Sequence, residues 1–414
     1  MNPVLRPAIH AAGTSLMLLL TACMPGRASV PTTPSVSAST TPEPLGPGIA
    51  WWQRDDPRGP WRAMIVRIDL SQRDLSLRAV HARDSIAGRE LTSSMAQRVD
   101  RRDGARVRVA INADFFDLRT GQSENNQVTD GEWWVGRMVT DSPFDTYDNV
   151  HSQFALSHDG RGSIGRFLLE ARVWGPTGAL PLLGVNSMPA GLYEGTALYT
   201  PRFGARTPSP SPRDSTRRIA ELPLRAIAAH GDTLRYVVQG AVLPQGGTPI
   251  PADGAVLSTH GDRVPPVQRW QPGDTIRVWI GTMPRLTDGR PPQQLIGGWP
   301  RIVEGGVNVA ADAPVREGTI SRNAEARHPR SAIGVSKDGR TLWLYAVNGR
   351  SASSVGMTLV ELGDAMRALG AWDALNFDGG GSTTLVIDGR VVNTPTDATG
   401  ERAVANALLV LQRR

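Results

Sequence analysis

Short apolar stretches with strand-like spacing recur along the whole chain, and this recurrence constrains the fold more than any other feature of the sequence. Val66, Ile68 and Leu70 alternate with polar residues. Such alternation is typical of a strand with one buried face. Other segments of strand character are 75–80, 107–111, 234–242, 275–280, 332–335, 342–347, 374–377, 385–387, 391–392 and 403–411. A chain with this pattern must build its core mainly from sheets.

Hairpin turns and one helix complete the pattern. Lys337-Asp338-Gly339 and Asp388-Gly389 each separate two apolar runs, as in β-hairpins. A helix is predicted after Thr358, which forms a capping-box pattern with Glu361. Its apolar positions and its stop signal are Leu359, Leu362, Met366, Leu369 and Gly370. We therefore predict an α+β fold, with mixed, hairpin-rich β-sheets and a few packing helices in a single large domain.

Residues 1–23 predict a lipoprotein signal peptide. The apolar stretch from Ala11 to Ala22 is too short for a membrane span, which needs about 20 residues, but it matches the core of a secretory signal. Leu20-Thr21-Ala22-Cys23 resembles a bacterial lipobox. An ordinary signal with a coincidental cysteine is the alternative. We expect Cys23 to be lipidated and the exported protein to contact the cell membrane or outer membrane through this lipid only, facing the periplasm or the cell surface.

The rest of the chain divides at about residue 49. Residues 24–48 contain six prolines among many serines and threonines, which predicts an extended linker. Residues 49–414 form the predicted globular domain. Cys23 is the only cysteine, so this domain has no intramolecular disulfide although it is expected to be exported. Its stability must therefore come from its core.

The charge pattern gives no reason to expect a nucleic-acid partner. The chain has 45 basic and 39 acidic residues, and Lys337 is the only lysine. The densest basic run, 101–108, contains no aromatic residue. This run is typical of a solvated approach to a strand rather than of a nucleic-acid surface. We expect Lys337 to be an exposed turn residue rather than a covalent catalyst.

The clearest chemical signal follows the strand 374–377. Asp378 is placed there at the end of the strand, and the next four residues are Gly379, Gly380, Gly381 and Ser382. Glycines let the backbone approach a ligand closely, and successive N–H groups can form an anion-binding nest. The segment is not a P-loop, because no Gly-Lys-Ser/Thr follows it. A tight turn without function is the alternative.

Other polar residues stand at strand ends. Arg330 begins the strand before Ala332 and could bind phosphate through two parallel hydrogen bonds, or it could simply extend to solvent. Asn112 and Asp114 end a strand beside two phenylalanines. Apolar surroundings can raise the pKa of a carboxyl group, as a general acid requires, although Asp114 could also cap a turn. Glu401, Arg402 and Asn406 form a further polar group near the last strand.

Two common kinds of catalytic site are not indicated. The seven histidines are scattered without a His-x-His pair, and no Gly-x-Ser-x-Gly elbow occurs. The pattern therefore favours neither a zinc site nor a serine hydrolase.

Several segments together, in their order and spacing, resemble the phosphodiester glycosidase family. They are Ile111–Phe116, Leu198–Gly204, Thr248–Gly254, Gly297–Arg301 and Arg327–Leu408. The resemblance extends from about Ile49 to the C-terminus and implies the family's fold. The family often has glycine where Ala113 and Trp299 stand, so we expect Trp299 to alter the sugar site.

The resemblance implies hydrolysis of a sugar-1-phosphodiester or related glycan at the anomeric carbon, giving free sugar and a phosphomonoester without a cofactor. Asp378 is the first choice for the catalytic carboxylate, and Asp114 or Glu401 is the second. Arg330 would be catalytic at the departing phosphate. The expected substrate- and phosphate-binding residues are Asn112, Gly379, Gly380, Gly381, Ser382, Arg402 and Asn406. This scheme needs no metal. The several candidate carboxylates would nevertheless allow Mg²⁺ or Ca²⁺ to bind.

Two alternatives remain at this stage. One is a surface module that binds phosphorylated glycans or cell-wall polymers without turnover. The other is a metal-dependent phosphodiesterase that cleaves the P–O bond and leaves sugar phosphate.

Overall fold

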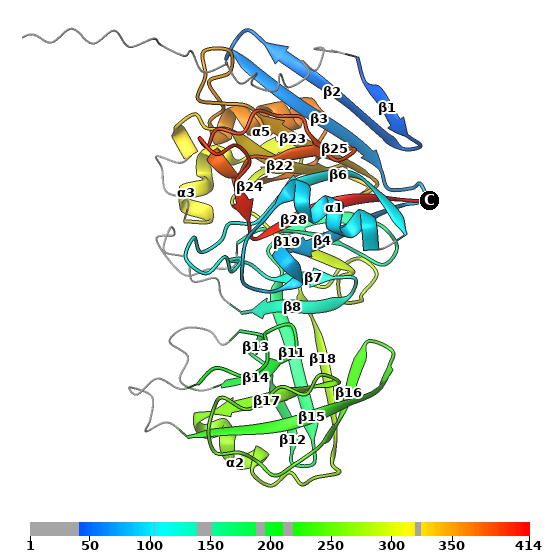
Figure 1. Ribbon diagram of the computed structural model, residues 1–414, viewed down its shortest axis with the longest axis vertical. Helices are drawn as coiled ribbons and strands as arrows, with labels where there is room; N and C mark the ends of the chain where they lie inside the picture. The colour runs from blue at the N-terminus through cyan, green and yellow to red at the C-terminus, as the bar shows by residue number, and fades with distance from the viewer. Residues whose placement is uncertain (1–40, 103, 139–150, 188–194, 210–217, 319–323) are drawn as a thin grey trace, which may run out of the picture. The chain divides into compact units, whose positions relative to one another are not determined.

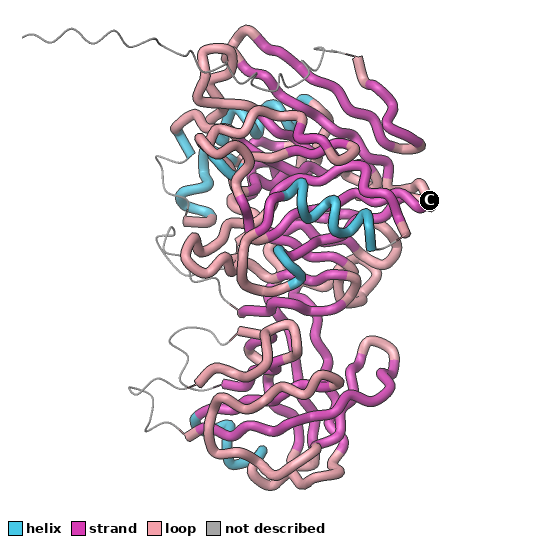
Figure 2. Tube along the Cα trace, viewed as in Figure 1, coloured by secondary structure: helices cyan, strands magenta, loops and turns pink. Residues whose placement is uncertain are grey.

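Antiparallel strand pairing dominates the computed structural model, which describes residues 41–102, 104–138, 151–187, 195–209, 218–318 and 324–414. Within these ranges, β13 (Gly184–Val185) and β14 (Gly195–Tyr199) are the one parallel pair of strands. Strands make up most of the regular structure and helices are few (Figure 2). The predicted α+β fold with hairpin-rich sheets is confirmed.

An eight-stranded sheet carries three of the C-terminal strands predicted from the sequence, those at 332–335, 342–347 and 374–377. Its neighbouring strands β22 (Arg330–Val335) and β24 (Asp373–Phe377) pair with Ser331 opposite Phe377. Strand β1 lies within residues 24–48, for which the sequence predicts a linker. In spatial order the strands are β1 (Glu43–Gly46), β2 (Ile49–Asp56), β3 (Trp61–Asp69), β23 (Thr341–Val347), β22 (Arg330–Val335), β24 (Asp373–Phe377), β20 (Arg301–Glu304) and β21 (Val307–Asn308).

A five-stranded sheet consists of β26 (Arg390–Val391), β25 (Leu385–Ile387), β6 (Ala105–Asn112), β28 (Asn406–Arg413) and β4 (Leu75–His81). The prediction of a single strand over 403–411 is wrong in one respect. β27 (Ala403–Val404) pairs with β5 (Glu90–Leu91) instead of joining β28. The strand breaks at Ala405, whose carbonyl accepts a hydrogen bond from the N–H of Ala82 at 2.8 Å.

A thirteen-stranded sheet contains most of the remaining strands. Arg202 follows the end of β14 (Gly195–Tyr199); its guanidinium lies 4.3 Å from the Trp134 ring centroid and pairs with Glu132 at 2.7 Å. In spatial order the strands are β10 (Gly162–Gly165), β9 (Gln153–Leu156), β19 (Gln294–Gly297), β7 (Gln127–Thr129), β8 (Glu132–Arg137), β13, β14, β17 (Gly254–His260), β15 (Ile219–His230), β16 (Thr233–Val238), β18 (Thr275–Met283), β11 (Leu168–Gly175) and β12 (Gly178–Pro181).

The helix α5 (Leu359–Ala368), the eight-stranded sheet, the five-stranded sheet and the helix α1 (Thr92–Arg102) form four layers, because side chains on each strand alternate between the two faces of its sheet. Leu344 on β23 and Val109 on β6 belong to the buried cluster between the two sheets. Tyr345 points to the opposite face, where α5 packs. On the outer face of the five-stranded sheet, α1 packs on β6 (Figure 1). The described residues form one compact unit.

The helices test the sequence patterns directly. The predicted capping box of α5 is present, because Thr358 Oγ1 accepts the N–H of Glu361 and the Glu361 carboxylate accepts the N–H of Thr358. The helix α1 was not predicted, although its buried residues have helical spacing. They are Thr92, Met95, Ala96 and Val99. The shorter helices are α2 (Val264–Val267), α3 (Ala313–Arg316) and the 3₁₀ turns Ala82–Asp84, Gly261–Arg263, Ala310–Asp312 and Gly380–Ser382.

Lys337 lies in the turn between β22 and β23, as predicted, with Nζ 4.6 Å from the ring centroid of Trp372. In the part of the chain that the structure describes, no helix is long and apolar enough to cross a membrane. Cys23 and the rest of the predicted signal peptide lie outside the described residues.

Candidate functional site

A cavity of about 180 Å³ opens at the end of β24 and the start of β22. It brings together the predicted residues Asp378, Arg330, Gly379 and Gly380, together with Trp299. Its other lining residues are Phe115, Pro300, His328, Arg350, Leu359 and Asn376. We call it the Asp378 cavity. A carboxylate, guanidinium groups and aromatic rings in one hollow are suited to a ligand with both an anionic and an apolar part.

The end of β6 fixes the position of Asp378. Its N–H donates to Ala113 O at 2.7 Å, and its carbonyl accepts from Asn112 Nδ2, also at 2.7 Å. Asn112 Oδ1 accepts from Ser331 Oγ at 2.7 Å and from the N–H of Thr384 at 3.0 Å. The buried Asn112 thus ties three segments together. These contacts give Asn112 a positioning role, and the substrate-binding role that the resemblance implied stays a prediction.

The Asp378 carboxyl holds its proton more strongly than an ordinary aspartate does. Burial raises its pKa to about 6, and the charge of Asp114 adds to this shift. The Ser382 hydroxyl, the N–H of Gly379 and the charge of Arg402 oppose it by favouring the ionised form. The N–H of Gly379 donates to Asp378 Oδ1 at 2.8 Å. Asp378 can therefore change protonation state close to neutral pH.

Asp114 lies behind the Asp378 cavity rather than in its lining. Burial raises its pKa to about 6, against two hydrogen bonds from Asn125 at 2.7 and 2.8 Å. Its own N–H donates to Asn406 Oδ1 at 2.9 Å, so Asn406 positions Asp114 and lies apart from the cavity lining. Gly297 leaves room for the carboxylate, since a Cβ there would lie 2.6 Å from Asp114 Oδ1.

The glycines after Asp378, with Ser382, form a loop that we call the glycine loop (379–382). A Cβ at Gly379 would lie 2.7 Å from Pro329 O. Gly380 has a φ of 61°, which disfavours other residues. A Cβ at Gly381 would lie 2.1 Å from Arg402 Nη2. Each glycine is therefore required for close packing or backbone conformation.

Protein acceptors already take three of the four backbone N–H donors of the expected anion-binding nest. The N–H of Gly379 donates to Asp378 Oδ1, that of Gly380 to Pro329 O at 2.9 Å, and that of Ser382 to Gly379 O at 3.1 Å. The glycine loop shapes the cavity and positions Asp378, while side chains supply the positive charge.

Arg330 supplies buried positive charge in the Asp378 cavity. Its Nε donates to Met357 O and its Nη2 to Ala326 O, both at 3.0 Å. Burial lowers its pKa to about 10, while the charge of Asp378 acts in the opposite direction. Two carbonyls thus hold the guanidinium in a fixed orientation beside the carboxylate.

Arg350 and His328 also line the cavity, and the sequence analysis missed both as site residues. Burial and the nearby charges of Arg330 and Arg350 lower the pKa of His328. Strand register could have indicated Arg350, because Arg330 pairs with Val347 and Arg350 follows three residues later. That inference needed the pairing of β22 and β23, which the hairpin signal at Lys337 provides.

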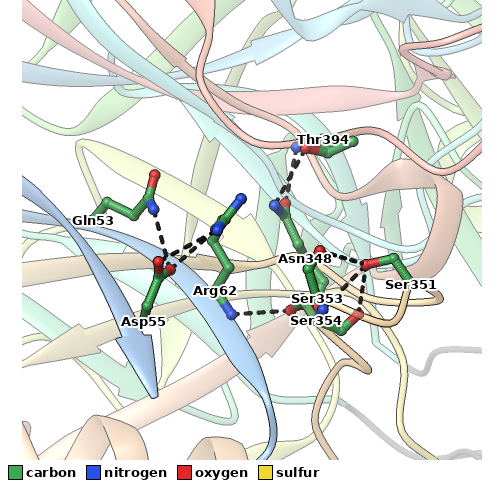
Figure 3. A network of polar contacts seen from close by, with 8 residues as sticks. All are labelled: Gln53, Asp55, Arg62, Asn348, Ser351, Ser353, Ser354 and Thr394. Carbon is green, nitrogen blue, oxygen red and sulfur yellow. Dashed lines mark hydrogen bonds and ion pairs between the residues drawn. The ribbon is translucent and has the colours of Figure 1, made fainter. Parts of the chain in front are cut away.

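A polar network holds the loop that carries Arg350 (Figure 3). Ser354 Oγ accepts the N–H of Arg62 on β3 at 3.0 Å and donates to Asn348 O at 2.7 Å. The Asn348 side chain binds Thr394 through Nδ2 at 3.3 Å and Oδ1 at 2.8 Å. The loop is thereby attached both to β3 and to the segment after β26. Such support allows Arg350 to keep its left-handed φ of 60°.

Aromatic rings form the wall beside these charges. Trp299 is buried, stacks on His151 at 4.8 Å between centroids and meets Phe115 edge-on at 5.4 Å. Its Nε1 donates to Glu317 O at 2.8 Å. Phe115 is half-buried and lines the cavity. The position where the resemblance pointed to an altered sugar site therefore lies in the cavity wall.

Glu401 and Arg402 lie elsewhere, in a separate hollow of about 600 Å³. The Glu401 carboxylate accepts from the N–H and Oγ of Ser93, at 2.9 and 2.6 Å, at the start of α1. Arg402 pairs with Asp397 through two hydrogen bonds of 2.7 and 2.8 Å. The structure does not bring Glu401 to Asp378. Arg402 contacts the glycine loop at Gly381 and is not part of the lining of the Asp378 cavity.

Among the residues that the structure describes, no group of three or more His, Cys, Asp and Glu side chains is arranged to hold a metal ion.

Comparisons with known proteins agree with the resemblance described above. The family described as phosphodiester glycosidase matches residues 226–411. The SPbeta prophage-derived uncharacterized protein YomE of Bacillus subtilis (strain 168) is 34% identical over 107 residues, which are 25% of this chain and 16% of that protein. The N-acetylglucosamine-1-phosphodiester alpha-N-acetylglucosaminidase of Mus musculus is 28% identical over 89 residues, 22% of this chain and 17% of that protein. The matches thus span about one sixth of these relatives.

A solved structure shows the same fold over most of the chain. The crystal structure of a hypothetical protein from Synechocystis superposes with a TM-score of 0.67 and 24% identity, covering 88% of this chain and 62% of that one. This superposition shows a shared fold, while the predicted likeness in sequence to the phosphodiester glycosidase family is confirmed by the match over residues 226–411.

Proposed function

Since residues 226–411 match the phosphodiester glycosidase family, we propose that this protein hydrolyses a sugar-1-phosphodiester at the anomeric carbon. The products are a free sugar and a phosphomonoester. The observation that carries the proposal is that the Asp378 carboxyl and the buried Arg330 guanidinium line the same cavity. The pKa of this carboxyl is about 6. The carboxylate acts at the anomeric carbon of the sugar, and the guanidinium stabilises the departing phosphate.

The cationic side chains stabilise the leaving group. When the bond between C1 and the phosphate oxygen breaks, its electron pair remains on the phosphate. Arg330 is held by two carbonyls, so its orientation costs little at the moment of reaction. Arg350 and His328 are the next polar groups along the same lining. A phosphate so stabilised departs without a strong general acid.

Asp378 acts on water. With a pKa of about 6, its carboxyl is mostly ionised at pH 7 and can accept the proton of a water molecule that attacks C1. Its negative charge also stabilises positive charge that develops on the sugar ring. Asp114 lies outside the lining and acts on the reaction through its charge, which raises the pKa of Asp378.

Phe115 and Trp299 provide a surface on which the sugar ring can pack. Their rings present an apolar wall opposite the charged groups, and sugar C–H faces pack on such surfaces. The name of the mouse relative, an N-acetylglucosamine-1-phosphodiester alpha-N-acetylglucosaminidase, makes N-acetylglucosamine the first sugar to test.

A product assay tests the proposal. The purified protein is incubated with a panel of sugar-1-phosphodiesters that includes UDP-sugars, and free sugar is separated from sugar phosphate. Free sugar, formed equally with and without a chelator, is the expected product. Sugar phosphate would identify P–O cleavage and overturn the proposal. Tight binding without any product would leave the phosphorylated-glycan binding module as the better interpretation.

We also propose that the protein acts outside the cytoplasm, attached to a membrane by lipid on Cys23. The lipobox-like sequence and the Pro/Ser/Thr-rich segment after it support this location.

A further inference from the structure

A second charged hollow lies close to the Asp378 cavity, with a volume of about 600 Å³. Four arginines line it, namely Arg83, Arg89, Arg119 and Arg402, and we call it the arginine pocket. Its two acidic residues, Asp397 and Glu401, are already engaged. Asp397 pairs with Arg402, and the Glu401 carboxylate accepts two hydrogen bonds from Ser93. The pocket therefore keeps a surplus of positive charge.

Arg83 and Arg89 supply most of this surplus. Both are exposed, and neither guanidinium lies within 4 Å of a carboxylate of the described residues. The carboxylate nearest to Arg119 is that of Asp117, at 3.8 Å and itself exposed to solvent. Two arginines without a close partner, together with a third whose partner Asp117 is exposed to solvent, attract an anion that carries more than one charge.

The backbone that presents Arg83 is held in an uncommon conformation. Arg83 and Asp84 have φ values of 54° and 53°, which non-glycine residues rarely adopt. Asp84 pairs with Arg98 at 2.5 Å and with Arg102 at 2.7 Å, and the N–H of Arg83 donates to Glu90 at 2.7 Å. These contacts maintain the turn and leave the Arg83 side chain in the pocket lining.

The glycine loop connects the two hollows. On the cavity side, a Cβ at Gly380 would lie 3.0 Å from Arg350 Nη2. A Cβ at Gly381 would lie 2.1 Å from Arg402 Nη2, which belongs to the arginine pocket. Arg350 also donates to Thr396 Oγ1 at 3.3 Å, one residue before Asp397. Cationic side chains therefore continue from the Asp378 cavity past the glycine loop into the arginine pocket.

We infer that the arginine pocket binds further phosphates of a phosphodiester-linked glycan polymer whose terminal sugar occupies the Asp378 cavity. The chemical class of the ligand in this inference rests on the proposed function. The anion-binding character of the pocket is argued from its arginines alone. A substrate with a single phosphodiester would engage Arg330 and Arg350. A polymer would reach Arg83, Arg89 and Arg119 as well.

The test measures binding to the full chain by calorimetry, with a glycerol phosphate hexamer as the probe. This probe has phosphodiester links but no glycosidic bond, so its binding does not depend on turnover. Arg83→Glu/Arg89→Glu is compared with Arg225→Glu/Arg269→Glu, which changes net charge equally at exposed arginines outside both hollows. Arg89→Glu alone is the second variant, should the Arg83 turn fail to fold.

In the pocket variant, Kd for the hexamer should rise at least about tenfold, and the slope of log Kd against log salt concentration should fall by about one to two. The control variant should bind as the unchanged protein does. Equal binding by all three proteins, or equal weakening in both variants, would overturn the inference. Arginine-dependent binding together with no sugar release from any sugar-1-phosphodiester would overturn the proposed function alone.

Discussion

Single residues of the site show what burial does to a carboxyl group. Asp114 and Asp378 have pKa values of about 6 because protein surrounds them, and the charge of Asp114 raises the pKa of Asp378 further. In both cases the folded state binds the proton more tightly than the unfolded state does. The stability of the fold therefore falls as pH rises from about 4 to about 6 through these two groups. Neutralising either one removes a cost of folding at pH 7.

Asp378→Asn separates catalysis from stability. Sugar release should fall at least a hundredfold, because the variant has no group to accept the proton of water. The free energy of unfolding at pH 7 should rise by about 1–2 kcal/mol, because a buried charge is removed and Asn can still accept the N–H of Gly379. Product assays and urea unfolding at pH 4 and pH 7 measure both effects. Full activity in this variant would remove Asp378 from the mechanism.

Asp114→Asn tests the electrostatic coupling of the two carboxyl groups. Activity should rise with pH through the pKa of Asp378, and removing the Asp114 charge should lower that pKa. The acidic limb of the profile of kcat against pH should therefore move to lower pH. A lower kcat with an unmoved limb would show that Asp114 only supports the local structure through Asn125.

Sequence reasoning placed Asp378 and Arg330 correctly in one cavity, because both stand at the ends of recognisable strands. The sequence could not show that Glu401, the second-choice catalytic carboxylate, lies outside the cavity that contains Asp378. Glu401 binds Ser93 at the start of α1, and α1 was not predicted. Arg350 was missed because a loop arginine has no periodic pattern, and only the pairing of Arg330 with Val347 brings it near.

Among the secondary-structure elements, the helix α5 is linked to the site through its capping box. Leu359, its first residue, lines the Asp378 cavity. Met357, just before the cap, accepts a hydrogen bond from Arg330. The start of the helix and the orientation of the guanidinium are therefore coupled.

Thr358→Ala should lower the free energy of unfolding by about 1 kcal/mol, because the N–H of Glu361 loses its side-chain acceptor. Sugar release should fall with it, since Met357 is adjacent. Val360→Ala is the matched control on the exposed side of the same turn and should change stability by less. Urea unfolding of both variants gives the comparison, and equal losses would argue against a role for the cap.

The glycine loop allows a second element-level prediction. In Gly381→Ala the new methyl group would overlap Arg402 and Asp397, so the ion pair or the loop must move. Both stability and sugar release should fall. Gly240→Ala is the control, because its added Cβ meets no atom within 4 Å. A fully active and stable Gly381→Ala protein would contradict the packing role given to this glycine.

The secondary-structure elements that the sequence predicted are those with a local pattern of apolar and turn residues. The capped helix and the hairpins of the last 90 residues have clear signals, and they were found. The pairing of strands in three sheets depends on contacts between distant segments, such as Ala332 with Asn376, and no local pattern specifies them. The break at Ala405 also depends on a distant partner, Ala82.

The whole molecule is stabilised without a disulfide in its described part. Large buried clusters lie between the first two sheets, under α5, under α1 and within the thirteen-stranded sheet. This arrangement agrees with the expectation that an exported chain with one cysteine must depend on its core.

Cys23→Ser should release the protein from the membrane fraction while leaving sugar release by the domain unchanged, because all the lining residues of the Asp378 cavity lie between Phe115 and Gly380. Cell fractionation and mass spectrometry of the mature N-terminus measure this outcome. A wild-type N-terminus without lipid would contradict the proposed anchor.

Lys337 gives the molecule a practical property. It is the only lysine among 45 basic residues, and it stands in the hairpin turn over Trp372, away from the lining of both hollows. Amine-directed reagents would therefore couple to one defined side chain, besides the chain's N-terminal amine. A dye or a solid support attached there would present every molecule in the same orientation, with the Asp378 cavity left open to substrate.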